Sequence, residues 1–322
     1  MIRFSTLLFF LIVLFSCSDS SEINVQKAVN PSIESNALDQ TSIVILGTTQ
    51  DAGSPQIGCV KKCCTSLKGN EKRMVSALGI IEPSSNKKYL IDATPDIENQ
   101  INILNEYSSS KDLPDGVFLT HAHIGHYTGL MYLGKEGANS QGIKVHVMSR
   151  MKKFIESNGP WNQLVENQNI RLNNLITRDT VKLSAKLKII PFIVPHRDEY
   201  SETVGYKIIG PNRSALFIPD IDKWDKWNSN IVHEISMVDF AFIDGTFYDG
   251  AEISHRDISE IPHPFIIESM NALRNISQQE KNKVYFIHFN HTNPALNENS
   301  NAYLSIMKNG FHVAKAKEVF PL

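Results

Sequence analysis

Three histidines stand close together in the segment LTHAHIGHYTGL, residues 119–130: they are His121, His123 and His126. Because alternate residues of an extended chain point to the same side, the imidazoles of His121 and His123 can reach one metal ion, and His126 follows after a turn assisted by Gly125. Imidazole binds zinc, iron and copper, so the spacing indicates a metal site without naming the metal. A solvated histidine-rich loop is the alternative.

Other polar side chains end, or nearly end, apolar segments that have the composition of strands. These residues are His196, Asp220, Asp244 and His288. In α/β folds ligands gather at the carboxyl ends of strands, so we expect these side chains to meet the histidine motif. One such histidine is usually an ordinary core residue, and the repetition is what favours a site. Asp244 and Asp92 are expected to orient ligands or form turns, because DG and DATPD are turn-forming sequences.

The elements that must position these side chains are short apolar segments rich in β-branched and aromatic residues. They are residues 42–47, 88–93, 116–121, 143–148, 187–196, 214–220, 239–245 and 283–289. Such segments are typical of strands buried on one or both faces. Helix-compatible segments at 95–107 and 149–158 lie between them. This alternation predicts an α/β protein whose sheets are covered by helices.

The composition favours a globular protein that acts on a small molecule. The chain has 322 residues, of which 42% are hydrophobic, and this is enough for a sizeable core. Its 32 basic and 34 acidic residues leave a formal charge of −2, without a run of Lys or Arg. We therefore expect no nucleic-acid partner and favour a small-molecule substrate.

The first residues predict export. Arg3 precedes the apolar run LLFFLIVLF, residues 7–15, which is too short to span a bilayer comfortably and is typical of a signal sequence. It leads into LFSC, residues 14–17, which resembles the lipobox of bacterial lipoproteins. We expect residues 1–16 to be a lipoprotein signal peptide and Cys17 to be the lipidated first residue of the mature chain. An uncleaved anchor or a plain signal peptide is the alternative.

The segment after Cys17 is expected to be a tether. Residues 17–40 are rich in Ser, Asn, Asp and Gln and lack an apolar period, so they predict a flexible connection to the lipid anchor. Residues 41–322 then form one domain. This organisation predicts an exported, membrane-anchored lipoprotein on the periplasmic side or the surface of a bacterial cell envelope.

The histidine motif and the later strand ends together resemble the metallo-β-lactamase superfamily, whose pattern is His-x-His-x-Asp-His, a later His, an Asp and a final His. HAHIGH fits this pattern except at Gly125. The resemblance implies that residues 41–322 form a four-layer αββα sandwich of the metallo-β-lactamase type. The site residues that it implies are His121, His123 and His196 for one ion, Asp220 as a bridge, and His126 with His288 for a second ion.

Further segments are similar to one branch of that superfamily. LGTTQDAGSPQIGC, LIDATPDIENQI, FIPDID and FIDGTFYD look like the branch that contains the pyrroloquinoline quinone biosynthesis protein B and the carbon–phosphorus-lyase phosphodiesterase. The quinone-biosynthesis protein usually has Gln at the position of His123 and Asp at that of Gly125. Without that aspartate the second ion loses a carboxylate ligand. We therefore expect one tightly held ion and a second position that is weak, empty or filled by another metal.

Three cysteines cluster in GCVKKCC: Cys59, Cys63 and Cys64. In an exported protein, a disulfide plus one free thiol is one interpretation, and three simple thiols are another. The resemblance implies a third: the related phosphodiesterase has a structural zinc bound by three cysteines of this loop and a histidine just after the final catalytic histidine, here His291. The Cys-x3-Cys-Cys spacing differs from the family's, so which cysteines bind stays open.

The site predicts metal-dependent hydrolysis of a phosphodiester or ester-type small substrate, because an ion held by three histidines lowers the pKa of its water towards neutrality. Asp220 is expected to orient that water or accept its proton, and His263 to assist the leaving group or hold a phosphate, unless it is a simple loop histidine. Zinc is favoured, with iron or manganese as alternatives at the catalytic site. An iron-dependent oxidative enzyme and a non-catalytic metal-binding lipoprotein are the competing hypotheses.

Overall fold

A computed structural model describes residues 36–253, 257 and 261–322 of the chain. The expected signal peptide and most of the expected tether, with Cys17, lie outside the described residues. These described residues belong to one compact unit. Leu38 packs against its hydrophobic core and donates its N–H to Tyr107 O at 2.9 Å, so the packed chain begins a few residues before Thr41. Across the described ranges, no helix is long and apolar enough to cross a membrane.

Two seven-stranded sheets form the centre of the fold. In spatial order the first contains β14 (Val319–Pro321), β1 (Ser42–Gly47), β2 (Ala77–Glu82), β3 (Lys87–Ile91), β4 (Gly116–Phe118), β5 (Ile143–Val147) and β6 (Ile170–Asn174). The second contains β13 (His312–Val313), β12 (Val284–Ile287), β11 (Phe240–Asp244), β10 (Ser214–Ile218), β9 (Val204–Ile209), β8 (Lys188–Ile193) and β7 (Val181–Lys182).

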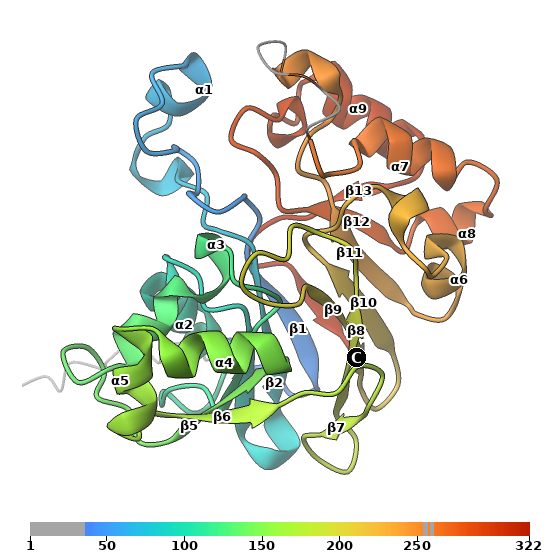
Figure 1. The fold of residues 1–322 in the computed structure, drawn as a ribbon. Helices are drawn as coiled ribbons and strands as arrows, with labels where there is room; N and C mark the ends of the chain where they lie inside the picture. Colours follow the sequence, from blue (N-terminus) through green and yellow to red (C-terminus); the bar gives the residue numbers. More distant parts are fainter. Residues whose placement is uncertain (1–35, 254–256, 258–260) are drawn as a thin grey trace, which may run out of the picture. The chain divides into compact units, whose positions relative to one another are not determined.

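Helices cover the outer face of each sheet (Figure 1). The first sheet is covered by α2 (Ile97–Glu106), α4 (Ser149–Ser157) and α5 (Trp161–Glu166). The second is covered by α6 (Ile231–Ser236), α7 (Ile266–Ala272), α8 (Gln278–Lys281) and α9 (Asn301–Lys308). Two short helices, α1 (Lys62–Thr65) and α3 (Ile124–Tyr127), lie in the loops that carry the cysteines and the histidine motif. The predicted four-layer αββα sandwich is confirmed.

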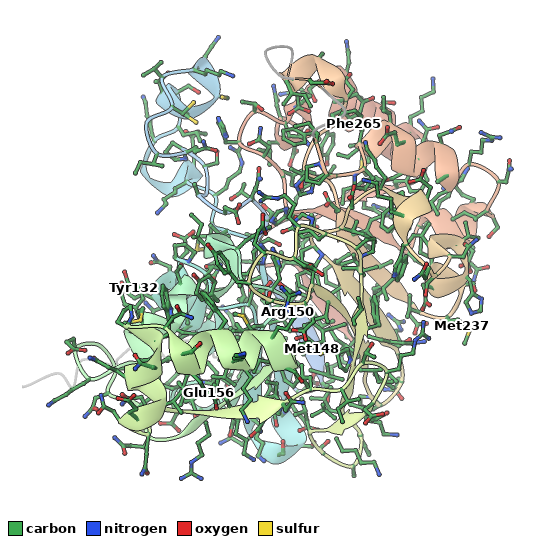
Figure 2. All side chains as sticks on the ribbon, in the orientation of Figure 1. Tyr132, Met148, Arg150, Glu156, Met237 and Phe265 are labelled. Carbon is green, nitrogen blue, oxygen red and sulfur yellow. The ribbon has the colours of Figure 1, made fainter. Side chains whose placement is uncertain are left out.

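The alternation of side chains along the strands builds these layers. Ile43 and Ile45 of β1 point into the core between the two sheets, whereas Val44 and Leu46 point outward to the helices. On β10, Phe217 faces the inner core and Leu216 faces the outer helices. A strand buried on both faces therefore needs a continuous apolar run, which is the pattern that the sequence shows. Side chains fill the space between all four layers (Figure 2).

The eight expected strands and both expected helices are present. The strands end earlier than their apolar segments: β4 stops at Phe118, β8 at Ile193 and β10 at Ile218, each two or three residues before a polar side chain of the site. The intervening residues form short loops at the strand ends. These loops give the site residues freedom to turn towards one another while the strands anchor them.

One buried histidine in the first sheet gives the fold a predictable dependence on pH. His146 of β5 is 7% exposed and stacks on Phe118, with ring centroids 4.2 Å apart and an interplanar angle of 5°. Burial, reinforced by Lys144, lowers the pKa of His146 to about 4. Between pH about 6.5 and about 4 the unfolded chain therefore binds a proton that the folded chain does not, and folding stability is lost as the pH falls through this window.

We expect His146→Phe to remove this part of the acid sensitivity, because the replacement ring cannot be protonated. Relative to the native chain, its stability should gain ~2–3 kcal/mol between pH 7 and pH 4. Urea unfolding of both proteins at a series of pH values measures the difference, and the contribution of other histidines cancels in the subtraction. Parallel stability curves would contradict the assignment.

Candidate metal centre

The candidate site lies where the carboxyl ends of parallel strands from both sheets meet. In the first sheet β1, β3 and β4 run in the same direction, and in the second β8, β10, β11 and β12 do. The residues that follow or end these strands are Asp51, Asp92, His121, His196, Asp220, Asp244 and His288. The loops therefore bring polar side chains from distant parts of the sequence to one point.

A first group of donors contains three imidazoles and one carboxylate. One ligand atom each of His121, His123, His196 and Asp220 lies within 4.8 Å of all the others. His121 Nε2 is 2.8 Å from His123 Nδ1 and 3.4 Å from Asp220 Oδ2, and His196 Nε2 is 3.7 Å from Asp220 Oδ1. His121, His196 and Asp220 are almost completely buried. This donor set suits zinc, and equally iron or manganese.

A second group of donors lies on the other side of Asp220. His126 Nε2 and His288 Nε2 are 3.1 and 3.2 Å from Asp220 Oδ2, and Asp51 Oδ1 is 3.7 Å from His126 Nε2. Four buried atoms here have no partner with hydrogen-bond geometry among the described residues. They are His126 Nε2, His288 Nε2, Asp51 Oδ1 and Asp220 Oδ1. Buried polar atoms without partners are costly, so their convergence fits a metal ion as the missing partner.

Hydrogen bonds behind the ligands fix the orientation of the imidazoles. Asp92 Oδ2 accepts from His126 Nδ1 at 2.7 Å, and Thr246 Oγ1 lies 3.0 Å from His288 Nδ1. Glu199 Oε2 is 3.1 Å from His123 Nε2. In each case one ring nitrogen is engaged and the other is left facing the donor groups, as a metal ligand requires.

The charges of the cluster suit a cation. Burial, followed by the neighbouring His126, holds the pKa of His121 well below its ordinary value, so this ligand is neutral. Burial also opposes the charge of Asp220, but the surrounding imidazoles, His288 foremost, hold the pKa of its carboxyl well below the usual range. Burial opposes protonation of His126, yet Asp92 and Asp220 hold its pKa well above the ordinary value, so a proton takes the place in which a cation would bind.

Two of the residues have an unusual backbone. Asp92 and His288 have φ values of 68° and 66°, in the left-handed region that costs ~1–3 kcal/mol for residues other than glycine. Both directly follow a strand, β3 and β12 respectively, and both side chains are buried. The reversal of the chain at these points turns the side chains into the site.

His263 also lies at the site. Its Nδ1 is 2.8 Å from Asp244 Oδ2 and 3.4 Å from Asp220 Oδ1. Burial disfavours the imidazolium form, but the Asp244 carboxylate overcomes this and raises the pKa of His263 to about 8. Asp244 in turn accepts the N–H groups of Thr246 and Ile221, at 2.9 and 3.2 Å. Asp244 therefore positions His263, in keeping with the orienting role expected for it.

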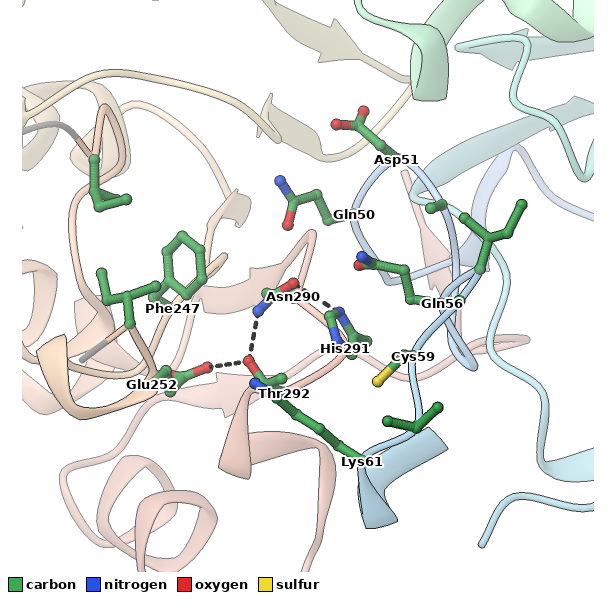
Figure 3. Close-up of a pocket in the computed structure, with 16 residues that line it drawn as sticks. Gln50, Asp51, Gln56, Cys59, Lys61, Phe247, Glu252, Asn290, His291 and Thr292 are labelled. Carbon is green, nitrogen blue, oxygen red and sulfur yellow. Dashed lines mark hydrogen bonds between the residues drawn. The ribbon is translucent and has the colours of Figure 1, made fainter. Parts of the chain in front are cut away.

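The cysteines form a separate donor group. One ligand atom each of Cys59, Cys63, Cys64 and His291 lies within 4.8 Å of the others, and no disulfide joins these three cysteines. His291 Nδ1 donates to Asn290 Oδ1 at 3.0 Å, which leaves Nε2 to face a metal (Figure 3). Three thiols and one imidazole fit a closed tetrahedral zinc site.

A pocket of about 570 Å³ connects the two donor regions. Its lining runs from Asp51 and Gln50 past Cys59 to Asn290 and Thr292 (Figure 3). Glu252 lines the same pocket beside Thr292: its Oε1 accepts from Tyr248 N at 2.6 Å, and its Oε2 accepts from Thr292 Oγ1 at 3.2 Å. Burial raises the pKa of Glu252 to about 7, so its carboxyl can be neutral and donate to an anionic ligand.

The structure brings together every site residue that the sequence analysis named within the described part of the chain. Asp51 and Glu199 were missed. Asp51 lies in the loop four residues after β1, and its place at the site depends on the contact of that loop with Gly125 of α3. Glu199 lies in an exposed loop, where an acidic residue gives no signal. Arg150, labelled in Figure 2, donates from Nη2 to Asp198 O at 2.7 Å and thereby holds that loop against α4.

Comparison with known proteins agrees with this fold and site. A family model described as the beta-lactamase superfamily domain matches residues 87–289, so the chain belongs to the beta-lactamase superfamily. Coenzyme PQQ synthesis protein B of Acinetobacter baumannii (strain ACICU) is 25% identical over 300 residues, which cover 84% of this chain and 97% of that protein.

Two solved structures illustrate the similarity. The Zn(2+)-bound PqqB from Methylobacterium extorquens has a TM-score of 0.74 at 21% identity, covering 87% of this chain and 100% of that one. A diphosphatase from the PhnP family has a TM-score of 0.59 at 18% identity, covering 88% and 99%. The resemblance to both members of the branch is confirmed.

Proposed function

We propose that this protein is a metal-dependent hydrolase of a phosphodiester or ester-type small substrate. The observation that carries the proposal is the convergence of His121, His123 and His196 with the buried carboxylate of Asp220, within 4.8 Å. Membership of the beta-lactamase superfamily and the zinc in the similar PqqB structure support metal binding. Three histidine ligands leave the fourth position of a tetrahedral zinc open for water or substrate, with the carboxylate of Asp220 beside it.

The residues around the metal would have different roles in hydrolysis. A zinc ion in such a site supplies a Lewis acid and brings the pKa of a bound water near neutrality. Asp220 orients the attacking water or accepts its proton, because its carboxylate lies between the two donor groups. Gln50, Lys61 and Asn290 give the adjoining pocket hydrogen-bond donors and a positive charge, which suit a phosphate ester.

An oxidative enzyme related to PqqB is the second candidate. The observation in its favour is that the match to coenzyme PQQ synthesis protein B of Acinetobacter baumannii (strain ACICU) spans 97% of that protein. Against it stands the imidazole of His123, which lies 2.8 Å from His121 Nε2, where we expect the quinone-biosynthesis protein to have an amide. A non-catalytic metal-binding lipoprotein is a third candidate.

The experiment that separates these candidates is an assay of the purified full chain, loaded in turn with zinc, manganese and iron. Aryl phosphodiesters, carboxylic esters and lactones are the substrates. The proposal expects phosphodiester hydrolysis with zinc or manganese under anaerobic conditions. Dioxygen consumption with iron and no hydrolysis would favour the second candidate, and metal binding without turnover would favour the third.

We further propose that Cys59, Cys63, Cys64 and His291 hold a structural zinc, and that the export signal and Cys17 anchor the protein outside the cytoplasm as a lipoprotein. The donor group around His291 supports the first point and the sequence supports the second. Fractionation of cells that express the native and the Cys17→Ser chain tests the anchor. Equal release of both chains from the membrane would contradict it.

The leaving group is expected to be assisted by His263, because its ring is held next to Asp220 by Asp244. His263→Ala should slow hydrolysis of an alkyl phosphodiester by ~10²-fold or more, since an alkoxide needs a proton to leave. With a 4-nitrophenyl ester, whose leaving group needs none, the loss should be small. Zinc content should not change. Equal losses on both substrates would show that His263 only supports the structure.

A further inference from the structure

The short helix α3, which contains the end of the histidine motif, has a glycine where the family pattern has a carboxylate, and the structure shows which residue fills the space. Gly125 is buried in α3. A Cβ atom added to Gly125 would lie 2.4 Å from Asp51 Oδ1 and 2.6 Å from Asp51 Cα. Contacts this short do not occur, so any side chain at position 125 competes with Asp51 for the same volume. Glycine is needed here because Asp51 is present.

The carboxylate of Asp51 points into the second donor group. Asp51 Oδ1 lies 3.7 Å from His126 Nε2, and one ligand atom each of Asp51, His126 and His288 lies within 4.8 Å of the others. His126 and His288 are 0% and 1% exposed, and both of their Nε2 atoms lack hydrogen-bond partners among the described residues. Two buried imidazoles and a carboxylate oxygen that face one another in this way form a donor set that suits a cation.

The backbone holds Asp51 in this position from both sides. Gln50 N donates to Phe289 O, and Phe289 N donates to Thr48 O, each at 2.8 Å, so the Asp51 loop is bonded to the residue that follows His288. Gly53, with φ of 71°, closes a turn by donating to Gln50 O at 2.8 Å. The carboxylate is therefore presented by a constrained loop and not by a mobile side chain on the surface.

We propose that Asp51 replaces the carboxylate missing at position 125 and, with His126, His288 and the shared Asp220, forms a second metal site. The carboxylate ligand would thus come from the loop after β1 and not from the histidine motif. The loop approaches the second donor group from the side opposite to α3. The expectation of a weak or empty second position assumed that no other carboxylate took the place of the missing one. This inference concerns metal binding and does not depend on which bond the protein cleaves.

The test moves the carboxylate from position 51 to position 125 in the full chain. Asp51→Gly should lose one ion per chain and keep the ion at His121 and the zinc at the cysteines. The double variant Asp51→Gly/Gly125→Asp should regain that ion, because the carboxylate returns from the opposite side into the vacated volume. Gly125→Asp alone should be destabilised, since Asp51 then occupies the space. Asp51→Asn, which keeps the volume, should weaken second-ion binding at least ~100-fold.

The readout is metal stoichiometry by elemental mass spectrometry and affinity by calorimetry, with circular dichroism to verify folding. An Asp51→Gly or Asp51→Asn chain that is folded and binds as many ions as tightly as the native chain would overturn the proposal. A native chain with a single ion outside the cysteine cluster would also overturn it. Because no activity is measured, failure of this inference is distinguishable from failure of the proposed hydrolysis.

Discussion

Replacement of Asp220 by asparagine is expected to lower kcat/KM for phosphodiester hydrolysis by ~10³-fold or more. Asp220 is 3% exposed, and its two oxygens lie 3.1 to 3.7 Å from nitrogen atoms of His121, His126, His196 and His288. Asparagine keeps the shape but removes the negative charge that both donor groups share. It also places an amide N–H where lone pairs are needed.

Metal content should fall together with activity in this variant, because the carboxylate is the link between the two donor groups. Asp222→Asn is the matched control: this aspartate lies two residues further on, and its Oδ2 pairs with Lys226 Nζ at 2.8 Å on the surface. The control should keep both properties. Full zinc content and full activity in Asp220→Asn would contradict the role assigned to this carboxylate.

Loss of the cysteine cluster is expected to have the largest effect on stability, and the effect should be local. In Cys64→Ser the buried thiol, which accepts from Gln56 N at 3.3 Å, becomes a poor zinc ligand. Structural zinc contributes ~10–16 kcal/mol of folding free energy in small zinc-dependent peptides, and we expect the segment from Ser54 to Lys72 to depend on it here. Hydrogen exchange in this segment should accelerate at least ~10-fold, with one zinc lost.

The backbone amides of the two sheets should stay protected from hydrogen exchange, since the hydrophobic cores of the sheets do not include the cysteines. Thr65→Ala, an exposed change in the same helix, is the control and should leave exchange unaltered.

Titration of thiols after denaturation separates a zinc site from a disulfide with one free thiol. In a Cys17→Ser chain, three reactive thiols with zinc bound at the cluster support the metal site, whereas one reactive thiol with no zinc there would show that a disulfide forms instead.

The sequence predicted the strands that carry the site better than the strands that do not carry it. Segments such as 214–220 are apolar on both faces because each strand lies between two hydrophobic layers. The resulting continuous apolar run identifies these strands in the sequence. β2 was not expected, although all six of its residues are buried. It contains Gly79, where an added Cβ would lie 2.5 Å from Leu104 Cδ1, so close packing of α2 selects a residue with no strand preference.

The ligands were predictable for a similar reason: a polar residue at the end of a buried strand is unusual, and the order of such residues matched a known pattern. Asp51 was not predicted because the residue that makes room for it, Gly125, has no side chain. Gly125 signals only that something is missing from the histidine motif. Which residue takes the space depends on the approach of the loop after β1 to α3, a tertiary contact that no local pattern encodes.

The measurement that tests the central claim most directly is a stepwise zinc titration of the chelator-treated, folded chain, with bound zinc and phosphodiester hydrolysis followed at each step. The account predicts no hydrolysis by the stripped chain and a rise in rate as zinc fills the site at His121, His123 and His196. The same titration of His121→Ala should give no activity at any zinc content. A native chain that takes up its full zinc and hydrolyses no phosphodiester would contradict the account.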